Sequence, residues 1–189
     1  MKHLSILGNQ TSMNFENVFT GALPDLVIVG LVSNTDLAGG YQRNPFNFRN
    51  FGVNRIELKR NGTFRPSKGY TPSFATKQYI KAYSTFLQEL ECDTGDKSVS
   101  LSLSEWATGY TLYAFKITDG PIKPGTYGPR SKSATGSARL EVSFTDAVNE
   151  NIKGVLLYQM LGRIDFDRFN VVLVLWALAV DFTLERSNV

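Results

Sequence analysis

The sequence predicts an all-β protein, an antiparallel sandwich or barrel of about eight short strands with one helix and one short helix between them. Three observations favour this class. Sixteen Gly and seven Pro separate many short apolar runs, as turns between strands do. Eight Tyr and thirteen Phe add residues that are common in strands. The apolar runs lack the regular exchange of strand and helix patterns that is typical of a parallel sheet.

Eight strand-like runs are placed by alternation and by turn residues. Asn61-Gly62 is the strongest hairpin signal, because both residues tolerate the positive φ of a type I′ turn. We expect Pro66 to end the return strand of this hairpin. Residues 14–23 form a polar approach, and residues 110–118, apolar on both faces, are expected in the middle of a sandwich. The eight runs cover residues 4–7, 26–32, 53–60, 63–65, 110–118, 140–144, 153–161 and 171–182.

Two segments change to a helical pattern. Apolar residues at three-to-four spacing over residues 72–90 predict an amphipathic helix with Ser73 as its cap. Ser102 and Glu105 have the spacing of a capping box and predict a short helix through residue 107. We expect Gly109 to end this second helix.

The totals of the chain limit its architecture and its partners. The 189 residues are enough for one domain with a sizeable core, and we expect a single domain over residues 1–189. A net charge of +3 allows a weakly attractive face for nucleic acid without requiring one. The single cysteine, Cys92, excludes a disulfide within the chain. The apolar run at residues 171–182 is shorter than the roughly 20 residues of a spanning helix, so we expect no membrane association.

Few residues of the chain could carry chemistry. His3 is the only histidine, so a Ser-His-Asp or metal site would have to form around the N-terminus. Asp165 and Asp167 share one face of a strand and could transfer protons or bind a cation, but solvation or pairing with Arg163 and Arg168 is the favoured interpretation. We therefore predict no catalytic residues, no metal site, no cofactor and no enzymatic activity.

Residues 43–68 form a basic stretch, with seven Lys or Arg against Glu57 alone, a net charge of +6. Four phenylalanines are interleaved with the charges, a composition that can bind single-stranded nucleic acid by charge and stacking. Solvated charges over packed phenylalanines are the first interpretation, an assembly interface the second and DNA contact the third. The candidate nucleic-acid contacts are Arg55, Lys59, Arg60 and Arg65.

The segment Asn44-Pro45-Phe46-Asn47-Phe48 places two phenylalanines in a loop. Pro45 fixes its own φ and favours an extended Asn44, and the asparagine side chains can satisfy backbone groups of the turn. Both phenylalanines could plug the end of the sandwich, or the loop could present an aromatic anchor to a neighbouring subunit. These two interpretations are compatible, and the five residues are our candidate interface.

Several motifs follow one another in a fixed order over residues 2–171. They are Glu16-Asn17-Val18-Phe19, Leu23-Pro24, Val29-Gly30-Leu31-Val32, Asn44-Pro45-Phe46-Asn47-Phe48, Ala82-Tyr83, Gly109-Tyr110-Thr111-Leu112-Tyr113-Ala114-Phe115, Arg139-Leu140-Glu141-Val142, Val155-Leu156-Leu157-Tyr158 and Ile164-Asp165-Phe166-Asp167-Arg168. In this order the chain resembles the hexon-type major capsid protein of Polinton (Maverick) elements and adintoviruses. The two most specific motifs are Asn-Pro-Phe-Asn-Phe at residues 44–48 and Gly-Tyr-Thr-Leu-Tyr-Ala-Phe at residues 109–115.

The resemblance implies a double jelly-roll protein with three chains in each pseudo-hexagonal capsomer, and this chain matches only the C-terminal jelly roll. It therefore implies an eight-stranded antiparallel jelly-roll sandwich with one or two helices in the loops between strands. Residues 172–189 are a tail outside the resemblance. A fragment, a truncated endogenised copy and a jelly roll that stands alone all remain open.

The resemblance also implies the function. We expect a structural protein of a virion capsid that self-associates into trimeric or pseudo-hexameric capsomers, contacts other capsid proteins and assembles in the nucleus or cytoplasm of a host cell. Weak DNA contact is a further expectation. The alternative is a jelly-roll binding module that holds nucleic acid or carbohydrate through residues 43–68. A cupin-like metal enzyme is disfavoured, because it would need histidine ligands from facing strands.

Overall fold

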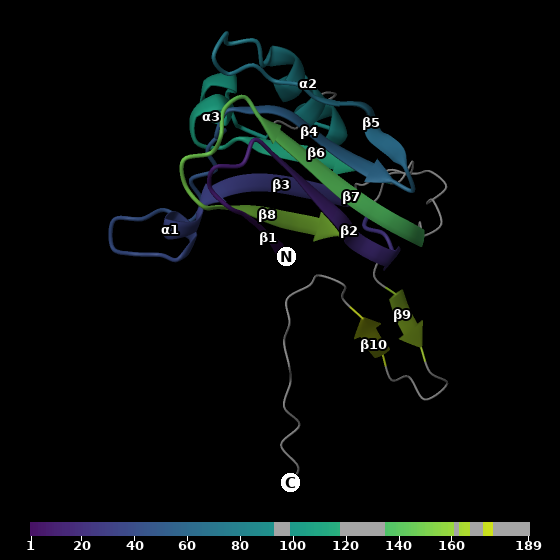
Figure 1. Cartoon of the computed structure of the whole chain (residues 1–189). Helices are drawn as coiled ribbons and strands as arrows, with labels where there is room; N and C mark the ends of the chain where they lie inside the picture. Colours follow the sequence, from purple (N-terminus) through teal and green to yellow (C-terminus); the bar gives the residue numbers. More distant parts are fainter. Residues whose placement is uncertain (93–98, 118–134, 161–162, 167–171, 176–189) are drawn as a thin grey trace.

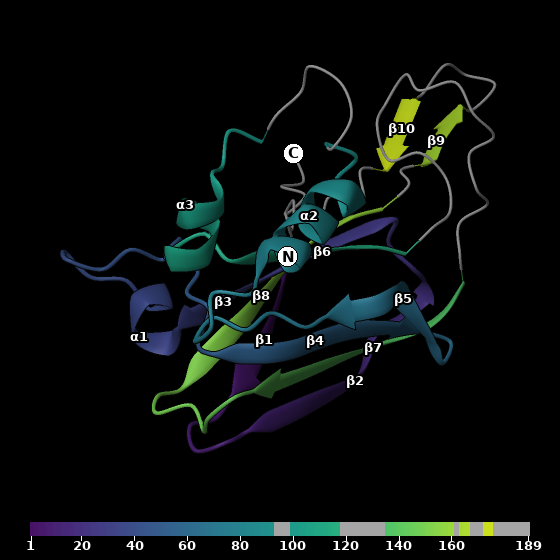
Figure 2. The same cartoon turned by 90° about the horizontal axis from the view of Figure 1, so that it is seen from above.

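The computed structural model describes residues 1–92, 99–117, 135–160, 163–166 and 172–175. Two four-stranded sheets pack face to face and make a sandwich (Figures 1 and 2). The first sheet has the order β1-β8-β3-β6 and the second the order β2-β7-β4-β5, with every pairing antiparallel. The strands are β1 (Lys2–Ile6), β2 (Ser12–Ala22), β3 (Leu26–Ser33), β4 (Val53–Arg60), β5 (Thr63–Tyr70), β6 (Leu112–Lys116), β7 (Thr135–Phe144) and β8 (Ile152–Gln159).

This strand order is that of a jelly roll. The chain crosses from one sheet to the other between most successive strands, so each sheet is built from strands that are distant in sequence. The predicted all-β jelly-roll sandwich is therefore confirmed. The hairpin between β4 and β5 is confirmed too, since Asn61 and Gly62 have φ values of 48° and 81°.

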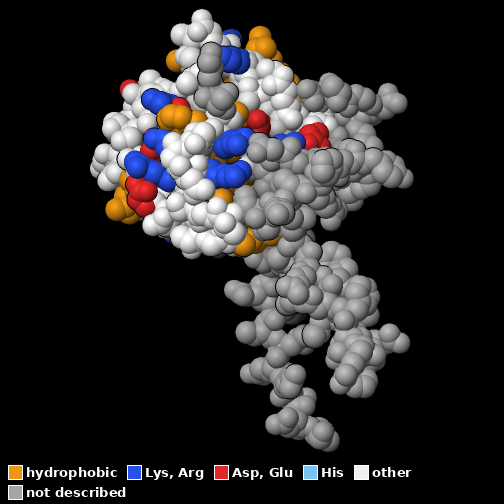
Figure 3. Space-filling view, turned by 90° about the vertical axis from the view of Figure 1, so that its right-hand side faces the viewer, with side chains coloured by type: hydrophobic (Ala, Val, Ile, Leu, Met, Phe, Trp, Pro, Cys, Tyr) orange, Lys and Arg blue, Asp and Glu red, His pale blue; other side chains and the backbone are white. Residues whose placement is uncertain are grey.

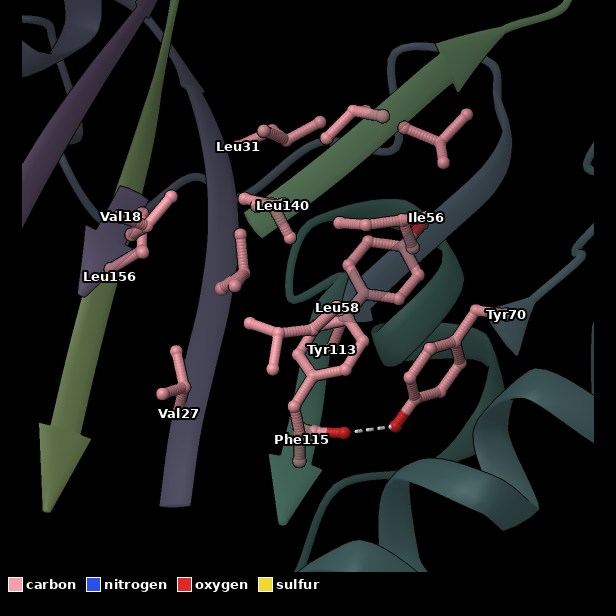
Figure 4. Packing of buried hydrophobic residues seen from close by; sticks show 14 of the residues in the cluster. Val18, Val27, Leu31, Ile56, Leu58, Tyr70, Tyr113, Phe115, Leu140 and Leu156 are labelled. Atoms are coloured by element: carbon pink, nitrogen blue, oxygen red, sulfur yellow. Dashed lines mark hydrogen bonds between the residues drawn. The ribbon is translucent and has the colours of Figure 1, made fainter. Parts of the chain in front are cut away.

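The interior lies between the inner faces of the two sheets (Figure 4). Val27, Leu31 and Phe115 line it from the first sheet, and Ile56 and Leu58 line it from the second. All five side chains are at most 1% exposed. Burial on this scale stabilises a sandwich by roughly 1.5–3 kcal/mol for each large apolar side chain.

The described part of the chain holds three helices, one more than the sequence predicted. α3 (Leu103–Thr108) has the predicted capping box between Ser102 and Glu105 and ends at Gly109. α2 (Ile80–Glu89) begins several residues after the predicted start, because Ser73 pairs with Gln78 in a short β-bridge instead of capping a helix. α1 (Asn34–Leu37) is a single turn that the sequence analysis missed.

Three predictions about strands were wrong. Residues 12–22 form a full strand, whose alternation is broken by an irregularity between Phe15 and Phe19 and by the positive φ of Asn17. β5 continues past Pro66 to Tyr70, because β5 is an edge strand that pairs on one side only. β6 also lies at the edge of its sheet and not in the middle, although Ala114 on its outer face is fully buried.

Side chains close the two open sides of the sandwich. On one side, α2 and α3 lie beside β6 and β5, and Trp106 of α3 contacts Tyr113. On the other side, Lys2 of β1 donates a hydrogen bond to the backbone carbonyl of Val18, at 2.6 Å, and lies over the ring of Phe19. The two sheets are thus tied together at both of their edges.

The outer edge of β6 is closed by three side chains. Trp106 Nε1 donates to the carbonyl of Leu112, at 2.9 Å, and the Tyr70 hydroxyl donates to the carbonyl of Ala114, at 2.6 Å (Figure 4). The carboxylate of Glu89 accepts the N–H of Lys116, at 2.6 Å. Three of the backbone groups that an edge strand would leave open to another strand are therefore occupied.

The C-terminal part of the described chain is a separate hairpin of β9 (Arg163–Phe166) and β10 (Val172–Leu175). Asp165 lies on β9, whereas Asp167 lies outside the described residues, as do residues 176–189 of the predicted tail. No helix in the described ranges is long and apolar enough to cross a membrane.

Candidate functional site

The loop at residues 44–48 is a compact turn held by its own hydrogen bonds. Asn44 Oδ1 accepts the N–H of Phe46, at 3.0 Å, and the Asn44 carbonyl accepts the N–H of Asn47, at 3.2 Å. The Phe46 carbonyl accepts the N–H of Phe48, at 3.0 Å. The Asn44 side chain thus satisfies a backbone group of the turn, as the sequence analysis expected.

Phe48 fastens this loop to the first sheet. Its ring packs against Gly30 of β3, so closely that a Cβ atom on Gly30 would lie 2.6 Å from Phe48 Cδ1. Its carbonyl accepts the N–H of Thr111, at 2.9 Å, and Phe48 forms a parallel β-bridge with Tyr110. Phe48 is therefore the residue that plugs the sheet, and glycine at position 30 makes the room for its ring.

Phe46 has the opposite environment. Its side chain is 69% exposed, although it lies two residues from the anchored Phe48. Tyr110, the bridge partner of Phe48, is also exposed, at 49%. The two phenylalanines thus differ in role: Phe48 is partly buried against the outer face of the first sheet, and Phe46 is presented to the solvent on a turn with little freedom.

Further contacts hold the segments on both sides of the loop. Arg43 pairs with Asp36 of α1, with 3.1 Å between Nη1 and Oδ1. After the loop, Asn50 Nδ2 donates to the carbonyl of Ala107 in α3, at 2.9 Å, and Asn50 Oδ1 accepts the N–H of Gly52. The sequence analysis missed these anchors and Tyr110; Ala107 and Tyr110 lie about 60 residues further along the chain, where only the fold brings them near the loop.

The four candidate nucleic-acid contacts do not form one basic surface, and two of them form ion pairs with acidic side chains. Arg55 Nε lies 2.8 Å from Glu57 Oε1, and Lys59 Nζ lies 2.6 Å from Glu141 Oε1. Alternation along β4 puts these two basic residues on the outer face of the second sheet. Acidic side chains lie among the basic ones on the face drawn in Figure 3.

The other two candidates lie elsewhere. Arg60 follows Lys59 directly, so it belongs to the opposite face of β4, and its Nη1 donates to the carbonyl of Ile117, at 2.9 Å. Arg65 is partly buried opposite Leu58 in the pairing of β4 with β5. The structure therefore does not bring the four residues together on one face.

The ion pair of Lys59 with Glu141 gives the sandwich a pH dependence. The hydrogen bond from Lys59 lowers the pKa of Glu141 below its ordinary value of 4.5, and Arg139 adds to this effect. A lowered pKa means that Glu141 stabilises the fold above about pH 4.5 and that this contribution is lost as the pH falls through the pKa of the folded state. Glu141→Gln should therefore lose up to about 1 kcal/mol of stability at pH 7 and less at pH 3, where a larger fraction of Glu141 is protonated.

Urea unfolding of both proteins at the two pH values checks this expectation. Asp146→Asn is the matched control, because Asp146 is an exposed carboxylate with no hydrogen bond or ion pair in the described part of the chain. An equal loss of stability at both pH values in Glu141→Gln would contradict the assigned role of the ion pair.

The remaining candidates for chemistry lie apart from this loop. His3 is exposed on β1, and the Cys92 thiol lies 3.4 Å from the carbonyl of Leu90. Within the described ranges, no group of three or more His, Cys, Asp or Glu side chains could hold a metal ion.

Fold and loop together define the class: an eight-stranded jelly-roll domain that carries an aromatic loop fixed to the outer face of its first sheet. No protein-family model matches the chain. The chain is similar to the uncharacterized protein F54H12.2 of Caenorhabditis elegans, with 25% identity over 103 residues. The match covers 53% of this chain and 25% of that protein, so the chain spans about a quarter of the length of this relative.

Proposed function

We propose that this chain is a structural subunit of a viral-type capsid and that it works by self-assembly. In this proposal it has no enzymatic activity and needs no cofactor. It self-associates into capsomers, contacts other capsid proteins and resides in the virion after assembly in the nucleus or cytoplasm of a host cell.

Two lines of argument support the proposal. The strand order is that of a jelly roll, a fold that viral capsid subunits share with lectins and cupins, so the fold alone does not choose among these functions. The ordered motifs, above all Asn-Pro-Phe-Asn-Phe, favour the capsid subunit. The C. elegans relative is uncharacterized and adds no argument about function.

The exposed Phe46 is the observation that carries the proposal furthest. Aromatic anchors dominate the energy of many interfaces, especially when the free protein already holds them in position. The hydrogen bonds of Asn44 and the packing of Phe48 hold this turn, so little conformational entropy is lost when Phe46 enters a pocket of a neighbouring subunit.

Electron microscopy and light scattering of the purified chain at high concentration test this function. We expect capsomer-like particles from the natural sequence and none from Phe46→Asp, because a buried unpaired carboxylate in an interface costs several kcal/mol. Since Phe46 is 69% exposed, its substitution should leave the unfolding midpoint unchanged.

Leu7→Asp is the matched control, with a similarly exposed leucine, at 60%, outside the loop. It should assemble like the natural sequence. A natural chain that stays strictly monomeric without any particles would overturn the proposed function. Particles of normal yield from Phe46→Asp would show that the loop at residues 44–48 takes no part in assembly.

A further inference from the structure

The outer face of the first sheet is apolar and open in the middle of β8, between the polar side chains of Lys153 and Gln159. The strand register places Leu157 opposite Ile28, and it places Val155 in the neighbouring row opposite Gly30. Leu157 is 53% exposed, and the other two apolar side chains are partly exposed. We call Ile28, Val155 and Leu157 the outer patch.

Most other apolar side chains of this outer face are covered by the chain itself, whereas its polar side chains His3, Ser5 and Gln159 are exposed. Phe48 lies over Gly30, and α1 packs beside β3 and β8. Val32 and Ala114, which belong to the same face, are fully buried. The outer patch is therefore an apolar part of the face that the described chain leaves without a full cover.

The two edges of the first sheet also differ in how far their backbone groups are occupied by hydrogen bonds. The outer backbone groups of β6 are bonded by Trp106, Tyr70 and Glu89. Within the described ranges, the backbone of β1 forms hydrogen bonds with β8 alone. The open edge thus borders β8, which also carries most of the outer patch.

A segment that fits this surface follows β8 directly. β10 is a run of four apolar residues, Val172–Leu175, so both of its faces are apolar by sequence. Among the strands that the structure describes, β9 and β10 pair only with each other, and they lie apart from the sandwich in Figure 1. An isolated two-stranded hairpin is at best marginally stable in water, so this one needs an apolar surface to pack on.

The hairpin of the same chain does not cover the outer patch. Leu157 stays 53% exposed in the presence of its own β9 and β10, which extend away from the sandwich. A second copy offers the same open patch and the same hairpin. Mutual exchange of the two hairpins about a two-fold axis would cover both patches and close the assembly.

We propose that the β9–β10 hairpin of each chain packs against the outer patch of a second copy, beside the open edge of β1, and that this exchange holds two chains in a closed dimer. The exchange does not depend on the proposed function, because it uses neither Phe46 nor the capsid resemblance.

Native mass spectrometry and sedimentation of the full chain over a wide concentration range test the exchange. The natural sequence should be dimeric, and Leu157→Lys should weaken the dimer at least about tenfold, since a charge in the patch costs 1.4 kcal/mol or more. Ile80→Lys is the matched control: Ile80 is 66% exposed on α2, and its substitution should leave the dimer unchanged. Circular dichroism confirms that each variant is folded.

A mixing experiment separates exchange from any other dimer. The double variant Val172→Lys/Val174→Lys keeps the patch and loses the apolar hairpin, whereas Leu157→Lys keeps the hairpin and loses the patch. Each should be monomeric alone, and a mixture of the two should form a heterodimer through one hairpin and one patch.

A natural chain that is monomeric at every concentration would overturn the exchange, as would a Leu157→Lys dimer of unchanged affinity or a mixture that stays monomeric. Failure of the capsid function is distinguishable. Dimers without particles would refute the capsid subunit alone, and particles from the natural chain together with an unchanged affinity of the Leu157→Lys dimer would refute the exchange alone.

Discussion

Replacement of Trp106 by alanine should destabilise the sandwich by about 4 kcal/mol, within the range for large aromatic side chains in a core. The Trp106 side chain is completely buried, and its Nε1 donates to the carbonyl of Leu112 at the edge of β6. It joins α2, α3 and the first sheet, because five aromatic rings lie around it. These rings are Phe74, Tyr79, Tyr83, Phe86 and Tyr113.

Urea unfolding followed by circular dichroism measures this loss. Trp106→Phe separates the two contributions, because phenylalanine keeps most of the packing and leaves the Leu112 carbonyl without its donor. We expect a loss of about 2 kcal/mol from this variant, from the lost hydrogen bond and a small cavity. A loss below about 1 kcal/mol in Trp106→Ala would show that the aromatic cluster does not hold the helices to the sheet.

Gly30→Ala should destabilise the protein by about 2 kcal/mol, although it adds only a methyl group. That carbon would lie 2.6 Å from Phe48 Cδ1 and 2.9 Å from a methyl carbon of Leu112. The Phe48 ring must then leave its place on β3. The loop at residues 44–48 should loosen with it, and assembly through Phe46 should weaken.

A double-mutant cycle checks the cause. In the background of Phe48→Ala, the added methyl no longer meets the ring, so the two changes should be coupled by about 1 kcal/mol or more. Gly154→Ala is the matched control in the same sheet, because its nearest atom would be the Cβ of Leu4 at an ordinary 3.5 Å. Equal costs at positions 30 and 154, or no coupling with Phe48, would contradict the proposed packing.

Local signals in the sequence were reliable wherever one short segment decides the structure. The Asn61-Gly62 turn depends only on two residues that accept positive φ, and the capping box depends only on Ser102 and Glu105. The predicted strand at residues 53–60 has the bounds of β4, although a register irregularity between Val53 and Arg55 interrupts its alternation. These features were predictable because their stabilising contacts lie within a few residues.

Features set by distant partners were not predictable. β2 was missed because its alternation is interrupted near Asn17, and only its pairing with β7 shows that it is a strand. Ser73 was an attractive cap, but its pairing with Gln78 prevents a helix at that point. β6 was placed in the middle of a sheet because both of its faces are apolar. It is an edge strand whose outer face is covered by other parts of the chain, which the sequence pattern cannot show.

The candidate site shows the same division. The turn at Asn44 follows from a short motif and was predicted, whereas only the structure shows that Phe48 packs on β3 and that Phe46 is exposed. The net charge of the basic stretch was misleading, because Glu141 comes from β7 and neutralises Lys59 across the sheet. A charge count along one segment cannot include partners that only the fold brings close.

The closed outer edge of β6 limits how large an assembly of this chain can grow by strand pairing. A sheet with two open edges can add copies without end and form fibres, which is a hazard for any β-rich protein at high concentration. With β6 occupied by Trp106, Tyr70 and Glu89, the first sheet can be extended on one side only, so a pair joined there has no free edge in that sheet. Three side chains thus prevent the first sheet from growing into an endless filament.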